Sequence, residues 1–301
     1  METKWLEAFT AVAEELHFGR AAERLHVAQS PLSQTIRRLE AEVGEPLFVR
    51  STRSVALTPA GEALLPHAYR VLDDVRSASE AARSAGGSVS GRLSIGFSGM
   101  HNHETLPLLA RSLRRDYPSI ELALQGGVRT YDGMRMVRGG KLDLAFVGLL
   151  GEPDPDLAYR VLARRRLGVV VSSEHRLAAR ERVAIGELRD EPFVMNPMDG
   201  TSSLSALVVQ VCQAAGFAPV IAQVVSDPFL VLGLVSAEVG VTMMTSEVLP
   251  VLPPHVAWLD LAGEPVEFVH AIVWRRDRES DRLAAAIHVL DEAFPGRECN
   301  D

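Results

Sequence analysis

Two short helical patterns joined by a tight turn constrain this chain more than any other feature. The first covers residues 20–25 and the second covers residues 30–43. Ser30 is a residue type that caps helix N-termini, and Pro31 suits the first helical position because its missing N–H has no intrahelical partner to lose. Gly44 is a typical helix end. The arrangement predicts a helix-turn-helix, whose second helix enters the DNA major groove.

The second helix is expected to have one apolar and one polar face. Apolar residues recur at steps of four, three and four, which places them on a single stripe: Leu32, Ile36, Leu39 and Val43. The opposite face is cationic in its middle and carries Ser33, Gln34, Arg37, Arg38 and Ala41. Taken alone, such a face is more typical of an ordinary solvated helix surface. The flanking sequence favours the DNA-binding interpretation.

The flanking segments supply the other parts of a DNA-binding domain. Helical spacing between Trp5 and Leu16 predicts a first helix of about four turns. Residues 47–58 have apolar, strand-like ends around a polar tip with arginines, which predicts a β-hairpin wing. Thr58 followed by Pro59 marks the start of another helix.

A heptad pattern runs along that next helix. Small and aliphatic residues recur at alternating steps of four and three: Leu64, Ala68, Val71, Val75, Ala78 and Ala82. This pattern predicts a long helix that pairs with a second chain. The alternative is packing against its own domain, but no neighbouring predicted element is long enough to cover the whole stripe. The glycine-rich segment 86–91 then predicts a hinge.

From Arg92 onward, short apolar runs alternate with helical patterns. Helices are expected near residues 103–115, 130–138, 202–215, 228–237 and 280–294, and the strand-like runs are LSIGF, IELAL, DLAFVG, LGVVVS, PFVMN, PVIAQVV, VGVTMM and FVHAIVW. Such alternation predicts a largely parallel sheet covered by helices on both faces. The last strand and helix look like a return to the first sheet, which predicts two α/β lobes, two crossings and a cleft.

Composition narrows the class of protein. No run approaches the ~18 apolar residues of a membrane span. The N-terminal segment is amphipathic and acidic, unlike a signal peptide, which argues against a secreted solute-binding protein. The two cysteines, Cys212 and Cys299, are far apart, which suits a reducing cytoplasm. The net charge of −8 argues against wholesale coating of nucleic acid but allows a local basic patch.

The run FTAVAEELHFGRAAERLHVAQSPLSQTIRRLEAEVGEPLFVRSTRSVALTPAGEALL resembles LysR-type transcriptional regulators, and the resemblance extends over essentially the whole chain. It implies an α+β multidomain fold, a homotetramer built as a dimer of dimers, promoter DNA as partner, and a small-molecule effector. The implied DNA-binding part is a winged helix-turn-helix at 1–58, followed by a linker helix for dimerisation at 59–86 and a hinge at 87–91. The implied effector domain is similar to periplasmic binding proteins. Its lobe I covers 92–163 and 268–301, and its lobe II covers 164–267.

The resemblance also implies DNA contacts. The residues matching the recognition segment are Gln29, Ser30, Pro31, Ser33, Gln34, Arg37 and Arg38. Gln34 departs from the arginine common at its position. Because glutamine pairs with adenine and arginine with guanine, the preferred base is expected to differ. Arg50 and Arg53 match the wing, where phosphate contact is expected.

The effector is expected at the ends of strands, where helix N-termini present free N–H groups. The candidate residues are Ser98, Gly99, Met100, His101, Asn102, Gly127, Val128, Arg129, Phe146, Val147, Gly148, Thr201 and Ser202. Family effectors are often carboxylates held by hydroxyl groups. Here Ser98 is retained, but Gly127 and Val128 stand where a hydroxyl pair is usual. Arg129 could supply the missing attraction, although loop arginines are usually just solvated.

Other interpretations of the same residues remain open. His101 and His103 could ligate a metal ion in a metal-responsive regulator, but no remote ligand is identifiable. The GFSG run resembles a nucleophile elbow, but Met100 stands where its final glycine is required. No nucleophile–base pair or nucleotide-binding motif is present, so neither catalysis nor a cofactor is expected.

Overall fold

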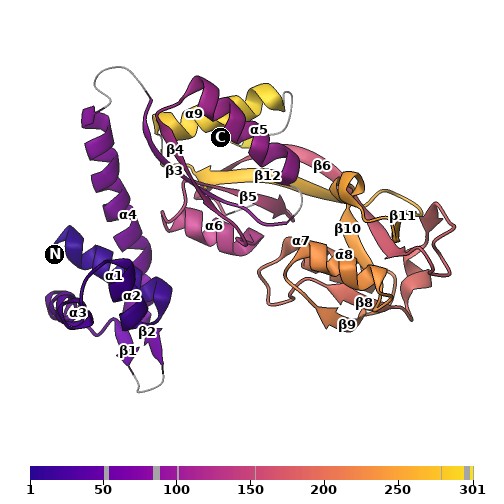
Figure 1. Cartoon of the computed structure of the whole chain (residues 1–301), viewed down its shortest axis with the longest axis horizontal. Helices are drawn as coiled ribbons and strands as arrows, with labels where there is room; N and C mark the ends of the chain where they lie inside the picture. Colours follow the sequence, from indigo (N-terminus) through magenta and orange to yellow (C-terminus); the bar gives the residue numbers. More distant parts are fainter. Residues whose placement is uncertain are drawn as a thin grey trace. The chain divides into compact units, whose positions relative to one another are not determined.

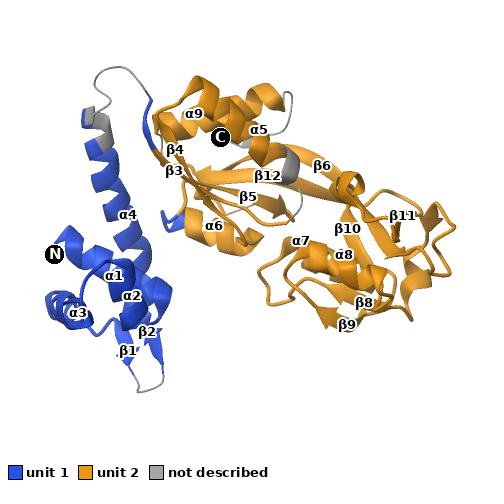
Figure 2. Cartoon of the chain, in the orientation of Figure 1, with its two compact units in different colours: residues 1–91, 138–141 blue, residues 92–137, 142–301 orange. Residues whose placement is uncertain are grey.

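The computed structural model describes residues 1–50, 54–83, 89–99, 102–152, 154–278, 280–294 and 299–300. The chain divides into two compact units, residues 1–91 with 138–141 and residues 92–137 with 142–301 (Figure 2). Each unit has its own apolar core. None of the described helices combines the length and the apolar character that a membrane-spanning helix requires.

The first unit begins with three helices, α1 (Thr3–Glu15), α2 (Phe18–Arg24) and α3 (Gln29–Val43) (Figure 1). The predicted stripe of α3 faces the core, since Leu32, Ile36 and Leu39 are buried and Val43 is partly buried against them. Phe9 of α1 packs in the same core. The apolar periodicity of α3 therefore identified its buried face.

The starts of α2 and α3 differ from the prediction. His17 caps α2 by accepting a hydrogen bond from the Arg20 N–H at 3.2 Å, so α2 begins two residues earlier. The N-cap of α3 is Ala28, which gives no side-chain cap, so the prediction that Ser30 caps this helix is wrong. Pro31 is the third helical residue, where its N–H is still not needed. Gly44 ends α3 in the left-handed conformation, φ 82°, as predicted.

A β-hairpin follows α3, as predicted for the wing. Strands β1 (Phe48–Arg50) and β2 (Val55–Leu57) pair antiparallel. The Glu40 carboxylate ties α3 to this hairpin by accepting hydrogen bonds from the Leu47 N–H at 3.0 Å, the Phe48 N–H at 3.4 Å and the Arg50 guanidinium at 2.9 Å. One carboxylate therefore sets the position of the wing relative to α3.

The long helix α4 (Pro59–Arg83) begins where Thr58 and Pro59 predicted, with the Thr58 hydroxyl accepting from the Gly61 N–H at 3.0 Å. The predicted heptad stripe divides into two parts. Ala68 is 1% exposed and is buried in the core of the first unit, so assigning it to a dimer seam is wrong, whereas Leu64 is only partly buried beside that core. Here α4 packs against α1, whose side chains belong to the same core. Val71 and Val75 are 42% and 47% exposed, and Ala78 and Ala82 are also exposed.

The second unit consists of two lobes, each with its own apolar core. Lobe I surrounds a core that includes Val137, Ala145 and Val273. Its elements are β3 (Gly91–Gly96), α5 (Asn102–Asp116), β4 (Ile120–Gln125), α6 (Thr130–Arg138), β5 (Leu144–Leu149), α9 (Asp281–Ala293) and β13 (Cys299–Asn300). Figure 1 shows α5 and α9 on one side of the lobe I strands and α6 on the other.

Lobe II surrounds a core that includes Val169, Phe193 and Leu259. Its elements are β7 (Arg182–Val183), the 3-10 helix Ile185–Leu188, β8 (Pro192–Met195), α7 (Ser203–Ala214), β9 (Val220–Val224), α8 (Pro228–Ser236), β10 (Thr242–Thr245), the 3-10 helix Ser246–Val251 and β11 (Val256–Leu261). The helices near 202–215 and 228–237 are present as predicted, whereas β7 and β11 had no strand prediction.

Two long strands join the lobes, β6 (Leu157–Ser172) and β12 (Glu267–Arg275). The main sheet has the order β4-β3-β5-β12-β6-β11-β7. β3 and β5 are parallel, but β12 is antiparallel to both β5 and β6, and β10 and β11 are antiparallel to β6. The prediction of a largely parallel sheet is therefore wrong. The returning β12 inserts between β5 and β6 in the opposite direction, which makes the sheet mixed.

Candidate functional site

The outward face of α3 presents the residues predicted to touch DNA. Ser33 is partly buried, and the others in this helix are exposed: Gln29, Ser30, Pro31, Gln34, Arg37 and Arg38. Among the described residues, Arg37 and Arg38 have no carboxylate partner, whereas Arg20 pairs with Glu15 at 3.1 Å. Unpaired guanidinium groups on an exposed helix face are suited to base edges and phosphates.

The wing places its one described arginine differently. The Arg50 guanidinium pairs with Glu40 at 2.9 Å and lies 4.7 Å from the centre of the Phe18 ring. These contacts fix its side chain beside the start of α2 and partly neutralise its charge. Arg53 lies outside the described residues.

A pocket that is partly open to solvent lies between lobes I and II. Its walls come from both lobes, and six predicted residues line it: Ser98, Gly99, Val128, Arg129, Phe146 and Ser202. The prediction missed ten others: Thr130, Asn196, Ser203, Leu204, Ser226, Pro228, Met244, Thr245, Val248 and Phe268. Asn196 follows β8 and Thr245 ends β10, so their positions at strand ends could have identified them, but Phe268 is the second residue of β12 and carries no such signal.

Some predicted residues lie elsewhere. Thr201 is next to the pocket rather than on its wall, and Gly127 is in the turn before α6. Val147 is 1% exposed and belongs to the lobe I core, because the side chains of β5 alternate between faces. Met100 and His101 lie outside the described residues. Asn102 begins α5.

Gly148 does not line the pocket but positions two residues that do. A Cβ at this position would lie 1.9 Å from the ring of Phe268, a pocket residue, so only glycine leaves room for that ring. The Gly148 N–H donates to the Thr130 hydroxyl oxygen at 3.1 Å. Gly148 was predicted to touch the effector, but its backbone and its missing side chain instead position two residues that line the pocket.

Buried hydroxyl groups connect the two lobes at the base of the pocket. Thr130 of lobe I lies 2.8 Å from the Ser203 hydroxyl of lobe II. Because Thr130 already accepts from Gly148, its own proton is available for Ser203. The Tyr131 N–H also donates to the Thr201 carbonyl at 3.2 Å. The N-terminus of α6 is therefore joined to the start of α7.

Three helices begin at the pocket wall, α6, α7 and α8. The Ser202 hydroxyl accepts from the Ser205 N–H at 3.3 Å and caps α7. Asp227 accepts from the Phe229 and Leu230 N–H groups at 2.8 and 3.0 Å and caps α8. Protein side chains therefore already take up part of the anion-attracting capacity of these helix ends.

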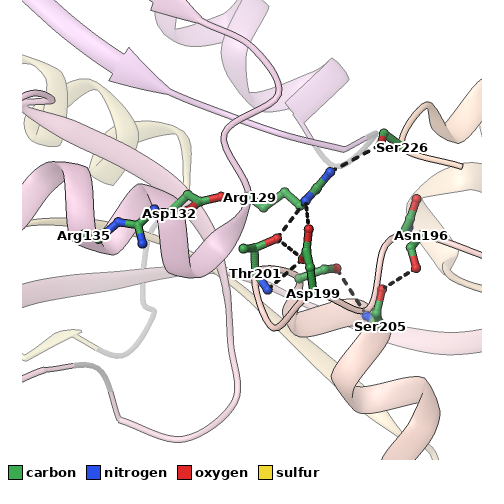
Figure 3. Close-up of polar contacts among 9 residues, drawn as sticks. Arg129, Asp132, Arg135, Asn196, Asp199, Thr201, Ser205 and Ser226 are labelled. Carbon is green, nitrogen blue, oxygen red and sulfur yellow. Dashed lines mark hydrogen bonds and ion pairs between the residues drawn. The ribbon is translucent and has the colours of Figure 1, made fainter. Parts of the chain in front are cut away.

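Arg129 is the only positively charged residue among the described residues that line the pocket. Its guanidinium donates to Asp199 Oδ2 at 2.9 Å, to the Thr201 hydroxyl at 2.8 Å and to the Ser226 hydroxyl at 3.3 Å, all in lobe II (Figure 3). Arg129 is therefore bound across the pocket rather than simply solvated. Hydrogen bonds from the Thr201 hydroxyl and N–H, together with the Arg129 charge, hold the pKa of Asp199 below its ordinary value.

A polar cluster lies behind the pocket, where β6 and β12 approach lobe II. The Glu247 carboxylate accepts from Arg165 Nε at 3.1 Å and from the Thr245 hydroxyl at 3.3 Å. His270 Nδ1 lies 3.8 Å from the same carboxylate. Thr245 lines the pocket, so one pocket residue is connected to both crossing strands.

A metal site has no structural counterpart in the described part of the chain. No group of three or more His, Cys, Asp or Glu side chains there is placed to hold a metal ion. His101 lies outside the described residues, and nothing is described of the His103 side chain. The metal-responsive alternative therefore gains no support.

Comparison with known proteins identifies two family domains in this chain. The family described as bacterial regulatory helix-turn-helix protein, lysR family, matches residues 3–62, and the LysR substrate binding domain matches residues 86–295. The HTH-type transcriptional regulator ShiR of Corynebacterium glutamicum (strain R) is 44% identical over 294 residues, covering 98% of this chain and 99% of that protein. AlsR of Bacillus subtilis (strain 168), another HTH-type transcriptional regulator, is 33% identical, covering 96% and 95%.

Solved structures show the same architecture. A crystal structure of full-length CbnR complexed with its target DNA has a TM-score of 0.70 and 26% identity, covering 97% of this chain and 100% of that chain. Full-length BenM has a TM-score of 0.60 and 26% identity, covering 98% and 97%. A DNA-binding helix-turn-helix and an effector-binding domain are thus joined in one chain, which belongs to the LysR family of transcriptional regulators.

Proposed function

We propose that this protein is a one-component regulator in which α3 reads a promoter and the pocket between lobes I and II senses a small molecule. The observation that carries the proposal is the pocket itself, which is walled by both lobes and contains one cation among hydroxyl groups and apolar side chains. A ligand in such a site contacts both lobes, so its binding energy can shift the population between two arrangements of the protein. The relatives are transcription regulators, and we infer regulation rather than catalysis for this chain too.

On the DNA side, we assign base contacts to the N-terminal half of α3. Gln34 is exposed in the second turn, on the side opposite the buried stripe, and glutamine suits adenine. Arg37 and Arg38 extend the same face. The wing arginines Arg50 and Arg53 are proposed to contact phosphates, which requires Arg50 to share its guanidinium with Glu40 or to release it.

Assembly is proposed through the exposed part of α4. Val71, Val75, Ala78 and Ala82 form an uncovered stripe that suits pairing with the same helix of a second copy, and two such dimers would form the tetramer. We propose that the two lobes meet at residues 163–164, inside β6, and at residues 267–268, at the start of β12. A promoter-binding bacterial regulator acts in the cytoplasm, where we place this protein.

The experiment separates DNA reading from effector sensing. Chromosomal DNA recovered with the protein supplies the binding site, and the neighbouring genes suggest which metabolites to screen for pocket binding by thermal shift. Gln34→Ala should weaken binding to that site by ~1–3 kcal/mol and relax preference at one base pair. Ser98→Ala should keep basal DNA binding but weaken the response to the metabolite, since a hydrogen bond worth about 1 kcal/mol is lost.

The control is Asp190→Asn, an exposed substitution in lobe II that should change neither measurement. If Ser98→Ala abolished basal DNA binding in a folded tetramer, the proposed separation of the two sites would be wrong. The same conclusion would follow if Gln34→Ala abolished metabolite binding.

A further inference from the structure

The guanidinium of Arg129 has two roles in the geometry of the pocket. It belongs to the pocket wall, and it is also bound by side chains of two separate lobe II loops. Asp199 and Thr201 come from the connection between β8 and α7, and Ser226 comes from the connection between β9 and α8. Figure 3 shows these three side chains converging on the guanidinium group. The single cation of the described pocket wall is thus held by a carboxylate of the same chain.

We infer that Asp199 is an internal competitor for the effector: an anionic group of the ligand binds Arg129 by displacing the Asp199 carboxylate. Asp199 then sets both the affinity for anionic ligands and the discrimination against neutral ones. The ligand class is a small molecule with a carboxylate or a similar anionic group next to an apolar body, which matches the apolar residues Phe146, Met244 and Phe268 on the wall. This inference rests on the effector-binding function proposed above.

The ion pair between Arg129 and Asp199 can open, which lets Arg129 bind an anionic ligand in place of Asp199. The Asp199 side chain is 51% exposed and that of Arg129 is 25% exposed, so water screens their attraction. Asp199 Oδ1 also accepts from the Thr201 N–H at 3.1 Å and from the Thr201 hydroxyl. These bonds are independent of Arg129, and they remain when the guanidinium turns to a ligand. Displacement therefore leaves Asp199 with partners and with access to water.

Arg129 is also suited to a second carboxylate. A guanidinium group presents five N–H donors in a planar fork that matches a carboxylate in a bidentate manner, whereas Asp199 is engaged through NH1 alone. A ligand with a carboxylate can therefore form a pairing that Asp199 does not form in this arrangement. A neutral ligand gains no such advantage.

The two lobes remain connected during this exchange. The Thr130–Ser203 hydroxyl pair and the bond from the Tyr131 N–H to the Thr201 carbonyl do not involve the Arg129 guanidinium. Release of Asp199 consequently changes the charge at one point of the pocket rim without removing every contact between the lobes. The competition is local, so it can be measured on the free protein without DNA.

The test uses benzoate as the probe and benzamide as its neutral isostere, with the full chain, at constant ionic strength. Benzoate is a small, rigid carboxylate with an apolar ring. Asp199→Asn keeps the shape of the side chain and removes its charge. Calorimetric titration should show benzoate binding roughly two- to fivefold more tightly to Asp199→Asn than to the natural chain, the range typical of an exposed ion pair. Benzamide affinity should be the same for both.

Two controls test whether the increase in benzoate affinity comes from the pair of Arg129 and Asp199. Asp190→Asn makes the same chemical change at an exposed lobe II position and should leave benzoate affinity unchanged. The second control is a chain that carries Arg129→Gln and that circular dichroism shows to be folded. In that chain, the further change Asp199→Asn should no longer raise benzoate affinity. Preservation of the increase without Arg129 would overturn the inference.

The inference would also be overturned if benzoate bound equally well to the natural chain and to Asp199→Asn. It would be overturned as well if the Asp199→Asn chain showed no preference for benzoate over benzamide. Failure of the proposed function has a different signature, because that function is tested on DNA. A chain that recovers no specific DNA site would refute promoter reading while leaving the benzoate measurement intact.

Discussion

Gly148→Ala is expected to force the Phe268 ring into the pocket. The added Cβ would lie 1.9 Å from the nearest ring atom and within 2.7 Å of two others. Carbon atoms in contact prefer ~3.5–4.0 Å, so the ring must retreat by about 1.5 Å or more. Phe268 is 2% exposed and packs in the lobe II core, where close packing leaves no free volume. The open side of the ring is the pocket.

The expected cost is that of overpacking, about 1–3 kcal/mol. Urea unfolding of the chain, followed by tryptophan fluorescence, should show a lower midpoint. The matched control is Gly233→Ala in α8, where a Cβ would meet nothing within 4 Å. That substitution should leave stability unchanged or raise it by up to about 1 kcal/mol, because alanine is the better helix former.

A double-mutant cycle tests the cause. Phe268→Leu alone should destabilise by leaving a cavity, but together with Gly148→Ala the two changes should partly compensate, with a coupling of about 0.5–3 kcal/mol. Strictly additive effects would show that the Phe268 ring is not what occupies the space above Gly148. A Gly148→Ala chain as stable as the natural one would refute the argument directly.

Other substitutions test other parts of the molecule. Val71→Asp with Val75→Asp should yield monomers or aggregates in light scattering, because charges at a helix seam lose their solvation; an unchanged oligomer would refute the seam. Arg53→Ala should weaken binding to all DNA sequences alike and lower the salt-dependence slope by about one, whereas an effect at a single base pair would mean that the wing reads sequence. Burial raises the pKa of Cys212 from 9.0 to about 11, which lowers its thiolate fraction about a hundredfold. In a Cys299→Ser chain, iodoacetamide at pH 8 should therefore modify Cys212 at least that much more slowly in the folded than in the unfolded protein, and equal rates by mass spectrometry would contradict its burial.

Local patterns predicted most of the DNA-binding unit. The stripe of α3, the glycine that ends it and the hairpin after it depend on neighbours close in sequence, and the structure has all three. The start of α3 was misplaced because Ser30 has the chemistry of a cap, whereas the turn after α2 brings Ala28 to that position instead. Capping preference is a weak guide when a tight turn dictates the backbone.

Non-local contacts account for the larger errors. The first ten residues of β6 were not predicted because three consecutive arginines, Arg164 to Arg166, hide the strand pattern. Each of them finds a carboxylate elsewhere in the chain, such as Glu247 for Arg165 and Asp260 for Arg166. Ala68 fitted the heptad equally well whether it faced α1 or a second copy, so periodicity alone could not distinguish the two. The ends of predicted elements identified six residues of the pocket wall. The contact of the Phe268 ring with Gly148 could not be predicted in this way, because it depends on the pairing of β5 with β12.

Because β6 pairs with β12, lobe II is an insertion that begins and ends at neighbouring positions of one pair of strands. Arg166 and Glu267 are direct cross-strand partners, so the chain leaves and re-enters lobe I at adjacent points of one ladder. A two-residue hairpin turn placed between these positions would close lobe I without moving either strand. Conversely, the segment between them could be exchanged for that of a relative through a single pair of junctions. Recombination at this ladder offers a route by which regulators can acquire half of a new effector pocket while keeping the DNA site they read.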